Sequence, residues 1–306
     1  ICSAEMDVAT GRIVYTMFLN EKGGIEADLT VTRLSETAYL AVVPGATLQR
    51  NLAWMRSQLG DDFAVITDMT AAESVLCVMG PKARELMQRV SPADFSNAAH
   101  PFGTAREIEI GMGLGRAHRV TYVGELGWEL YLPSDQTAHA FEALEEAGAD
   151  LGLKLCGLHT LDSCRIEKAY RHFGHDITDE DHVLEAGLGF AVKTRKGDFI
   201  GREAVLAKEQ AGLDRRMMQF RLKDPAPLMF HNEAIVRDGQ IVGPVTSGNY
   251  GHFLGAAIGL GYVPSTGQSD ADLLGARYEI EIAGKRHEAV ASLAAMYDPK
   301  SERVRA

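Results

Sequence analysis

The chain has 306 residues, of which 46% are hydrophobic and 24% charged, and its formal net charge at pH 7 is −11. This length allows one large domain or two to three smaller ones with a core that needs no disulfide or metal ion. The acidic balance disfavours nucleic acid as a partner, because phosphate binding needs a basic surface.

The four cysteines, Cys2, Cys77, Cys156 and Cys164, share no C-x-x-C spacing. We therefore expect neither a metal site nor a disulfide framework, which suits a reducing compartment such as the cytoplasm, or the mitochondrial matrix in a eukaryote. No apolar run approaches the ~20 residues of a membrane span, so we expect no membrane partner. We find no signal peptide at the start either.

The first predicted element is a hairpin. An apolar strand over residues 13–19 leads into a turn at Gly23 and Gly24, and a second strand starts just after it. Alternation places the apolar side chains of the second strand on one face and its polar side chains on the other. The polar set is Glu26, Asp28, Thr30 and Thr32. Either this polar face is exposed to solvent, or it lines a cavity in which Asp28 is held by the adjacent hydroxyl groups.

Mixed strands and helices follow, which predicts an α+β body over residues 1–204. The predicted strands are 39–43, 63–67, 74–79, 108–117 and 118–132. The predicted helices are 46–59, one that begins after Pro81, 137–151 and 159–170.

Residues 205–306 have a different sequence pattern, with short predicted strands separated by Gly, Pro and Asn turns. Asp238-Gly239 and Ala283-Gly284 are hairpin-type breaks. This pattern predicts a small β-barrel domain at the C-terminal end. Its strands are expected at 215–222, 233–237, 240–246, 256–262, 277–282 and 285–292.

A turn flanked by Gly124 and Gly127 carries the acid Glu125, with Tyr122 and Trp128 close by in sequence. Such a glutamate can be an ordinary solvated loop acid. It can also accept paired N–H donors from a flat heterocycle that stacks on the aromatic neighbours.

Arg165 lies four residues after Leu161 and seven after Leu158, so it shares their apolar helix face. An arginine on an apolar stripe needs a partner. That partner is either an acid of the chain or a ligand carboxylate, and the sequence alone leaves both open.

Two further patterns are weak. The run Gly111-Met112-Gly113-Leu114-Gly115 lacks the spacing and the context of a dinucleotide fingerprint. His172, His175 and His182 lack the helical i, i+4 spacing of metal ligands, so we expect no metal site.

Together these runs resemble the folate-binding family typified by the glycine-cleavage aminomethyltransferase, and most closely the C-terminal folate module of sarcosine and dimethylglycine dehydrogenases. The resemblance covers nearly the whole chain. Its motifs, in chain order, are Val14-Tyr15-Thr16, Gly23-Gly24 through Asp28-Leu29-Thr30-Val31, Val123-Gly124-Glu125-Leu126-Gly127-Trp128-Glu129-Leu130, Leu161-Asp162-Ser163 with Glu167-Lys168-Ala169-Tyr170-Arg171, Leu184-Glu185-Ala186-Gly187-Leu188, and Tyr297-Asp298-Pro299 with Arg303.

The resemblance implies that Asp28 is the catalytic carboxylate near the reacting nitrogens of tetrahydrofolate. It implies that Thr30 and the backbone around Val42 line the pterin pocket, with Tyr15 packed beside it.

The resemblance also implies that Glu125 grips the pterin edge, with Tyr122, Leu126 and Gly127 around it. Arg165 is expected at the distal end of the cofactor. Glycine-cleavage members place an aromatic residue near the C-terminus where this chain has Glu302 and Arg303, and Arg303 is expected to hold a glutamate carboxylate there.

The implied activity is that of an aminomethyltransferase-like enzyme. It captures the iminium or methylene group from oxidised sarcosine or dimethylglycine as 5,10-methylene-tetrahydrofolate. The iminium carbon is attacked by N5, and N10 then displaces the amine while Asp28 moves a proton.

Oxidation needs a flavin, and no flavin-binding segment is visible in the chain. Because the chain begins at Ile1 and not at a methionine, we expect an FAD domain upstream, or one that acts in trans.

Two alternatives remain. One is a free-standing folate-dependent aminomethyltransferase or demethylase. The other is a non-catalytic folate-binding assembly factor, which is disfavoured because Asp198 stands where the signature of such factors has a cysteine.

Overall fold

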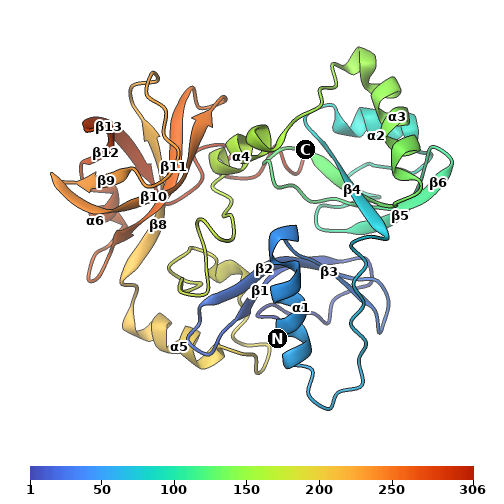
Figure 1. Ribbon diagram of the computed structural model, residues 1–306, viewed down its shortest axis with the longest axis horizontal. Helices are drawn as coiled ribbons and strands as arrows, with labels where there is room; N and C mark the ends of the chain where they lie inside the picture. The colour runs from blue at the N-terminus through green and yellow to red at the C-terminus, as the bar shows by residue number, and fades with distance from the viewer. The chain divides into compact units, whose positions relative to one another are not determined.

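The computed structural model describes residues 1–306 in two units that interleave along the chain (Figure 1). The first unit comprises residues 1–5, 15–29 and 158–299, and the second comprises residues 6–14, 30–157 and 300–306. The predicted boundary at residues 204 and 205 lies within helix α5 (Arg202–Ala211) and stays a prediction.

The predicted hairpin is present as β1 (Ile13–Leu19) and β2 (Ile25–Arg33), and β3 (Tyr39–Val42) completes a sheet of order β1-β2-β3. The predicted alternation in β2 holds from Ile25 to Val31: Ile25, Ala27, Leu29 and Val31 are buried, whereas Glu26, Asp28 and Thr30 are half-buried. It is wrong for Thr32, which was expected on the polar face and is fully buried.

The turn between β1 and β2 is closed by Asn20. Its Oδ1 accepts hydrogen bonds from the backbone N–H of Lys22 (3.0 Å) and of Gly24 (2.9 Å). A Cβ on Gly24 would lie 2.0 Å from the carbonyl oxygen of Asp179, so only glycine fits there. This close approach fixes the entry into β2 and hence the placement of Asp28 along the strand.

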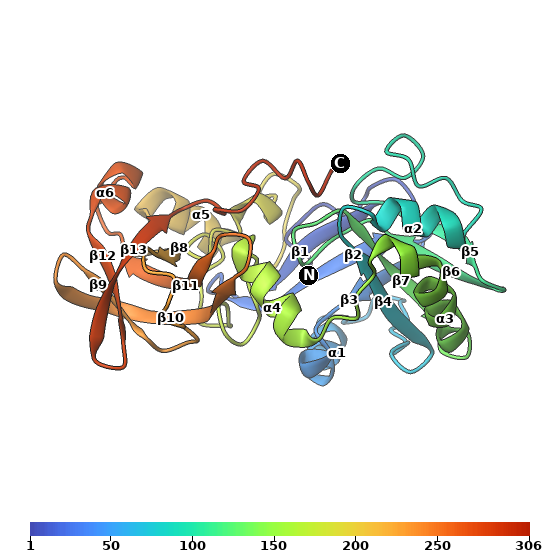
Figure 2. The same cartoon turned by 90° about the horizontal axis from the view of Figure 1, so that it is seen from above.

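The second unit contains a four-stranded antiparallel sheet of order β4-β7-β6-β5. Its strands are β4 (Glu73–Met79), β5 (Ala105–Ile110), β6 (Gly113–His118) and β7 (Gly127–Pro133). Helices α2 (Ala83–Val90) and α3 (Thr137–Gly148, continued by the short helix Ala149–Leu151) pack on one face of this sheet (Figure 2). The core between them includes Met87, Trp128 and Leu130. Helix α1 (Leu48–Ser57), preceded by the single turn Gly45–Thr47, also belongs to this unit.

Three predicted strands in this unit are wrong. Residues 108–117 form a hairpin, not one strand, because Gly111 adopts a positive φ of 59° and turns the chain. Residues 119–126 form a loop between β6 and β7, in which the buried Arg119 donates to the carbonyl of His100. Residues 63–67 form no strand, because no neighbouring strand pairs with them.

The first unit contains a closed antiparallel barrel of order β10-β11-β8-β13-β12-β9, so the predicted C-terminal barrel is confirmed. Its strands are β8 (Arg215–Leu222), β9 (Ala234–Arg237), β10 (Gln240–Gly251), β11 (Ala256–Pro264), β12 (Tyr278–Ile282) and β13 (Lys285–Ser292). Fully buried Phe220, Val245 and Ile280 belong to its core. A short helix, α6 (Asp270–Gly275), was not predicted and begins with a Ser269 capping box.

Helix α4 (Leu158–Glu167) packs against barrel strands β10 and β11 (Figure 2). The side chain of Gln219 donates to the carbonyls of Ile166 (2.6 Å) and Glu167 (3.0 Å), which satisfies the C-terminal end of the helix. The Glu167 carboxylate accepts the backbone N–H groups of Phe253 and Leu254, both at 2.8 Å. The barrel thus fixes the position of α4 and of Arg165 on it.

The longest helix, α3, has 12 residues, and no helix combines the length and the apolarity that crossing a bilayer requires.

Candidate active site

Asp28 lies half-buried on the polar face of β2. Its Oδ2 accepts a hydrogen bond from the Tyr15 hydroxyl at 3.0 Å. Its Oδ1 is buried and has no hydrogen-bond partner. The expectation that the adjacent threonine hydroxyls hold Asp28 is wrong, because the holding group is the phenol of β1. A buried acceptor without a donor costs free energy, so the site is suited to a ligand that brings an N–H group.

Burial raises the pKa of Asp28 from 3.8 to about 6, and the hydrogen bond from Tyr15 acts in the opposite direction. A carboxyl group with this pKa exchanges protons readily near neutral pH. This is the property that a general base or acid needs at physiological pH.

Phe190 is a site residue that the sequence reasoning missed. It lies in the short helix Gly189–Ala191 and stacks on Tyr15, with ring centroids 6.1 Å apart and an interplanar angle of 22°. Its side chain is 66% exposed. An aromatic surface is therefore available beside Tyr15, the residue that donates to the Asp28 carboxylate. The signal in the sequence was its place two residues after the Leu184–Leu188 motif, but a single aromatic residue is more often part of a core.

Arg165 is only 2% exposed, and its partner is an acid of the chain. Its guanidinium donates to Asp176 Oδ2 (2.5 Å), Asp162 Oδ1 (2.8 Å) and Ser247 Oγ (2.8 Å). Asp176 is itself fully buried. Of the two interpretations left open by the sequence, the acidic partner is the one observed, and the role of Arg165 at the distal end of the cofactor stays a prediction.

Glu125 lies in the second unit on a loop that is held on both sides. The Thr121 hydroxyl accepts the N–H groups of Val123 (3.2 Å) and Gly124 (3.1 Å). On the other side, a Cβ on Gly127 would lie 2.3 Å from Met79 Sδ. The side chain of Glu125 is 23% exposed, and its Oε1 lies 4.0 Å from Arg303 Nη1. The structure therefore brings these two predicted residues together.

Trp128 does not supply a stacking surface beside Glu125, so that expectation is wrong. The indole is fully buried in the core and packs edge-on against Phe95, with centroids 5.2 Å apart. The reason is the alternation of β7, which points Trp128 and Leu130 to the same buried face. Tyr122, on the loop before it, is half-buried.

The remaining predicted residues lie in the second unit. Thr30 on β2 pairs with Val42 on β3, and both are half-buried. Leu126 is buried in the core of the unit, and its carbonyl accepts the N–H of Gly80 at 2.8 Å.

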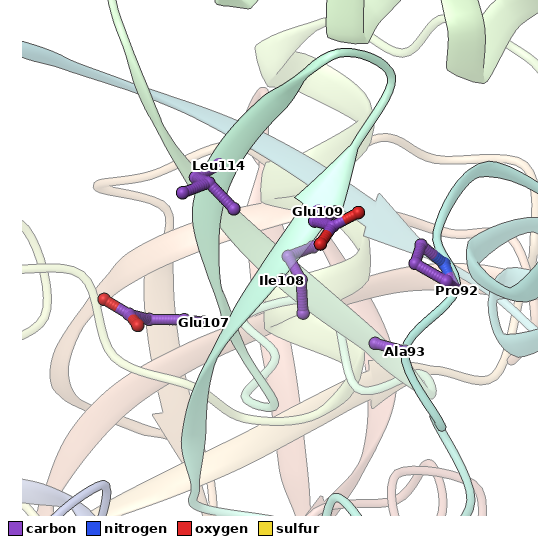
Figure 3. A pocket seen from close by; sticks show the side chains of 6 residues that line it. All are labelled: Pro92, Ala93, Glu107, Ile108, Glu109 and Leu114. Atoms are coloured by element: carbon purple, nitrogen blue, oxygen red, sulfur yellow. The ribbon is translucent and has the colours of Figure 1, made fainter.

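The shape of the surface alone does not select a site. Figure 3 shows a hollow in the second unit that none of the predicted residues lines. Its walls are Pro92, Ala93, Glu107, Ile108, Glu109 and Leu114. No group of three or more His, Cys, Asp or Glu side chains is arranged to hold a metal ion.

Comparison with known families gives a clear answer. The family model described as the GCVT N-terminal domain matches residues 1–196, and the model described as the glycine cleavage T-protein C-terminal barrel domain matches residues 215–298. The chain belongs to the glycine cleavage T-protein family. The predicted family and the predicted aminomethyltransferase-like class are thereby confirmed.

Several relatives match along 99% of the chain. A Paenarthrobacter nicotinovorans protein named 4-methylaminobutanoate oxidase (formaldehyde-forming) is 43% identical, and the match covers 36% of its length. Human mitochondrial sarcosine dehydrogenase is 36% identical, and the match covers 35% of its length. The chain thus spans about a third of the length of these relatives.

The fold agrees with a solved structure. The crystal structure of glycine cleavage system aminomethyltransferase T from Bartonella henselae superposes with a TM-score of 0.82 at 24% identity, and the match covers 96% of this chain and 78% of that one. The predicted α+β fold with a C-terminal barrel is confirmed.

Asp28→Asn should stabilise the fold at pH 8 and have little effect near pH 3.5. The folded pKa of about 6 lies above the ordinary value of 3.8. The folded state therefore binds more protons between these values, and it loses stability as the pH rises through them. The gain at pH 8 should reach up to about 3 kcal/mol. Chemical denaturation at both pH values measures it, with Glu26→Gln as the control from the same strand face. A gain that does not depend on pH would contradict the assignment.

Arg165→Ala should destabilise the fold by about 3–5 kcal/mol, because it leaves the carboxylate of Asp176 buried without its cation. The control is Arg216→Ala, which removes the exposed pair with Asp270 and should cost less than about 1 kcal/mol. Urea denaturation measures both. A stable Arg165→Ala variant with weakened tetrahydrofolate binding would instead support the cofactor contact that the resemblance implies.

Proposed function

We propose that the chain is a tetrahydrofolate-dependent one-carbon transfer module. It captures the iminium or methylene group of an oxidised N-methyl amine, such as sarcosine or dimethylglycine, as 5,10-methylene-tetrahydrofolate. The observation that carries the proposal is the carboxylate of Asp28, with one oxygen fixed by Tyr15 and the other buried without a donor, in a chain of the glycine cleavage T-protein family.

The residues of the first unit fit a flat heterocycle that carries N–H groups. The orphan oxygen Oδ1 of Asp28 is an acceptor for such a donor. The exposed ring of Phe190, stacked on Tyr15, offers an apolar surface for a planar ring. We assign Thr30, Val42, Tyr122, Glu125, Leu126 and Gly127 of the second unit to the pterin end.

Bound tetrahydrofolate supplies two nucleophilic nitrogens, each of which loses its proton when the methylene group is taken up. Both protons end on the departing amine, so the transfer is balanced without an oxidant or a reductant. Asp28 accepts a proton near the reacting nitrogens and passes it to the amine. Its ionised form also stabilises the positive charge of the incoming iminium group.

The oxidation step belongs to another part of the system. The chain spans about a third of the relatives named oxidase and dehydrogenase. We therefore propose that an FAD domain, joined upstream or acting in trans, generates the iminium group. The alternatives are a free-standing aminomethyltransferase or demethylase, and a non-catalytic folate-binding assembly factor.

Asp28→Asn should leave tetrahydrofolate affinity within a few-fold and lower the formation of methylene-tetrahydrofolate by roughly 10²–10⁴. The substitution keeps the shape and polarity of the side chain but removes the base and the negative charge. The assay supplies the chain with an amine-oxidising flavoprotein and sarcosine, and it scores methylene-tetrahydrofolate against free formaldehyde.

Glu26→Gln, two residues away on the same face of β2, is the control and should keep near wild-type capture. Equal losses in both variants would indicate a general electrostatic effect. Unchanged capture by Asp28→Asn would show that the proposed catalytic role is wrong.

A further inference from the structure

Residues 300–306 form a segment of the second unit that is held by hydrogen bonds at its C-terminal end. The carbonyl oxygen of Ala306 accepts hydrogen bonds from Arg84 (2.7 Å) and from Arg119 (3.0 Å). Asn97 donates to the carbonyl of Arg305 at 3.3 Å, and Val304 is only 2% exposed. The backbone of residues 305 and 306 is therefore held in place, and the N–H of Ala306 donates to the carbonyl of Arg303 at 3.3 Å.

One side chain of this fastened segment reaches the loop that carries Glu125. Arg303 Nη1 lies 4.0 Å from Glu125 Oε1, with the two side chains 47% and 23% exposed. The same loop begins at Arg119, which binds the end of the segment and lies over the ring of Trp128 at 5.8 Å from its centroid. The loop and the segment are thus joined at two points.

An ion pair this exposed contributes little to stability, typically about 0–1 kcal/mol. Its consequence is local, because a neighbouring cation restricts the orientation of a carboxylate. The Thr121 hydroxyl holds the backbone of the Glu125 loop, and Arg303 adds a restraint on the orientation of the Glu125 carboxylate.

We infer that Arg303 is a positioning residue for Glu125: it holds the carboxylate ready to accept the N–H donors of a planar heterocyclic ligand. This inference rests on the proposed function, and it differs from the expectation that Arg303 binds a glutamate carboxylate of the cofactor. In our assignment Arg303 acts through Glu125, and the length of the cofactor tail does not matter.

The test is a double-mutant cycle measured by calorimetry with 5-formyltetrahydrofolate, an oxidation-stable tetrahydrofolate, in its monoglutamate form. Arg303→Gln should weaken binding about fivefold in the wild-type background, in line with a partly exposed ion pair. It should have less than about a twofold effect when Glu125 is already Gln. Arg303→Lys keeps the cation and should restore most of the affinity.

Arg305→Gln is the matched control, because it removes the same charge from the same segment two residues away. Thermal unfolding of each variant checks that the fold is intact. An equal loss in both Glu125 backgrounds, or a loss that grows with added glutamates, would overturn the inference and favour direct tail binding. Unchanged affinity in Arg303→Gln would also overturn it. If the wild-type chain bound no folate, the proposed function itself would fail, and the two failures are therefore distinguishable.

Discussion

The hydrogen bond from Tyr15 to Asp28 is the interaction on which the chemistry of this chain depends. It joins two adjacent strands of one hairpin and fixes one carboxylate oxygen at 3.0 Å from the phenol, while the other oxygen stays buried without a donor. Burial without full satisfaction is costly, and it raises the pKa of the carboxyl to about 6. The buried carboxylate lowers the free energy of unfolding at neutral pH, and in return the strand carries a group that can exchange protons there.

The rest of the first unit holds this hairpin and its surroundings in place. Gly24 can approach the backbone of Asp179 because it has no side chain, and this contact fixes the turn that precedes Asp28. The barrel holds α4 through Gln219 and through the N–H groups that bind Glu167. Arg165, for which the sequence left both an acidic partner and a ligand open, joins α4 to buried Asp176 and to Ser247 of β10. Its surroundings show a structural ion pair of the kind that is strongly destabilising to break.

Local patterns in the sequence were enough for much of the fold. The period-two alternation of β2 and the Gly-interrupted strands of the barrel both rest on short-range geometry; the barrel is confirmed, and the alternation holds as far as Val31. The predictions that are wrong depend on tertiary contacts. Residues 63–67 form an apolar, β-branched run like that of a strand but have no strand to pair with, and Trp128 belongs to the core because helices cover that face of its sheet. Phe190 and the buried partner of Arg165, Asp176, lie on segments that meet their neighbours only in the fold, so periodicity could not reveal them.

One oxygen of Asp28 accepts the Tyr15 hydroxyl, and the other stays available to an N–H group of a ligand. The most direct test of this arrangement is the titration of the Asp28 carboxyl group. Carbon-13 NMR of the chain, with Asp28→Asn used to assign the signal, should give a pKa of about 6 for the free protein. Addition of 5-formyltetrahydrofolate should lower that pKa, because the orphan oxygen then accepts a hydrogen bond that favours the charged form. A free value near the ordinary 3.8, or a titration that saturating folate leaves unchanged, would contradict the account.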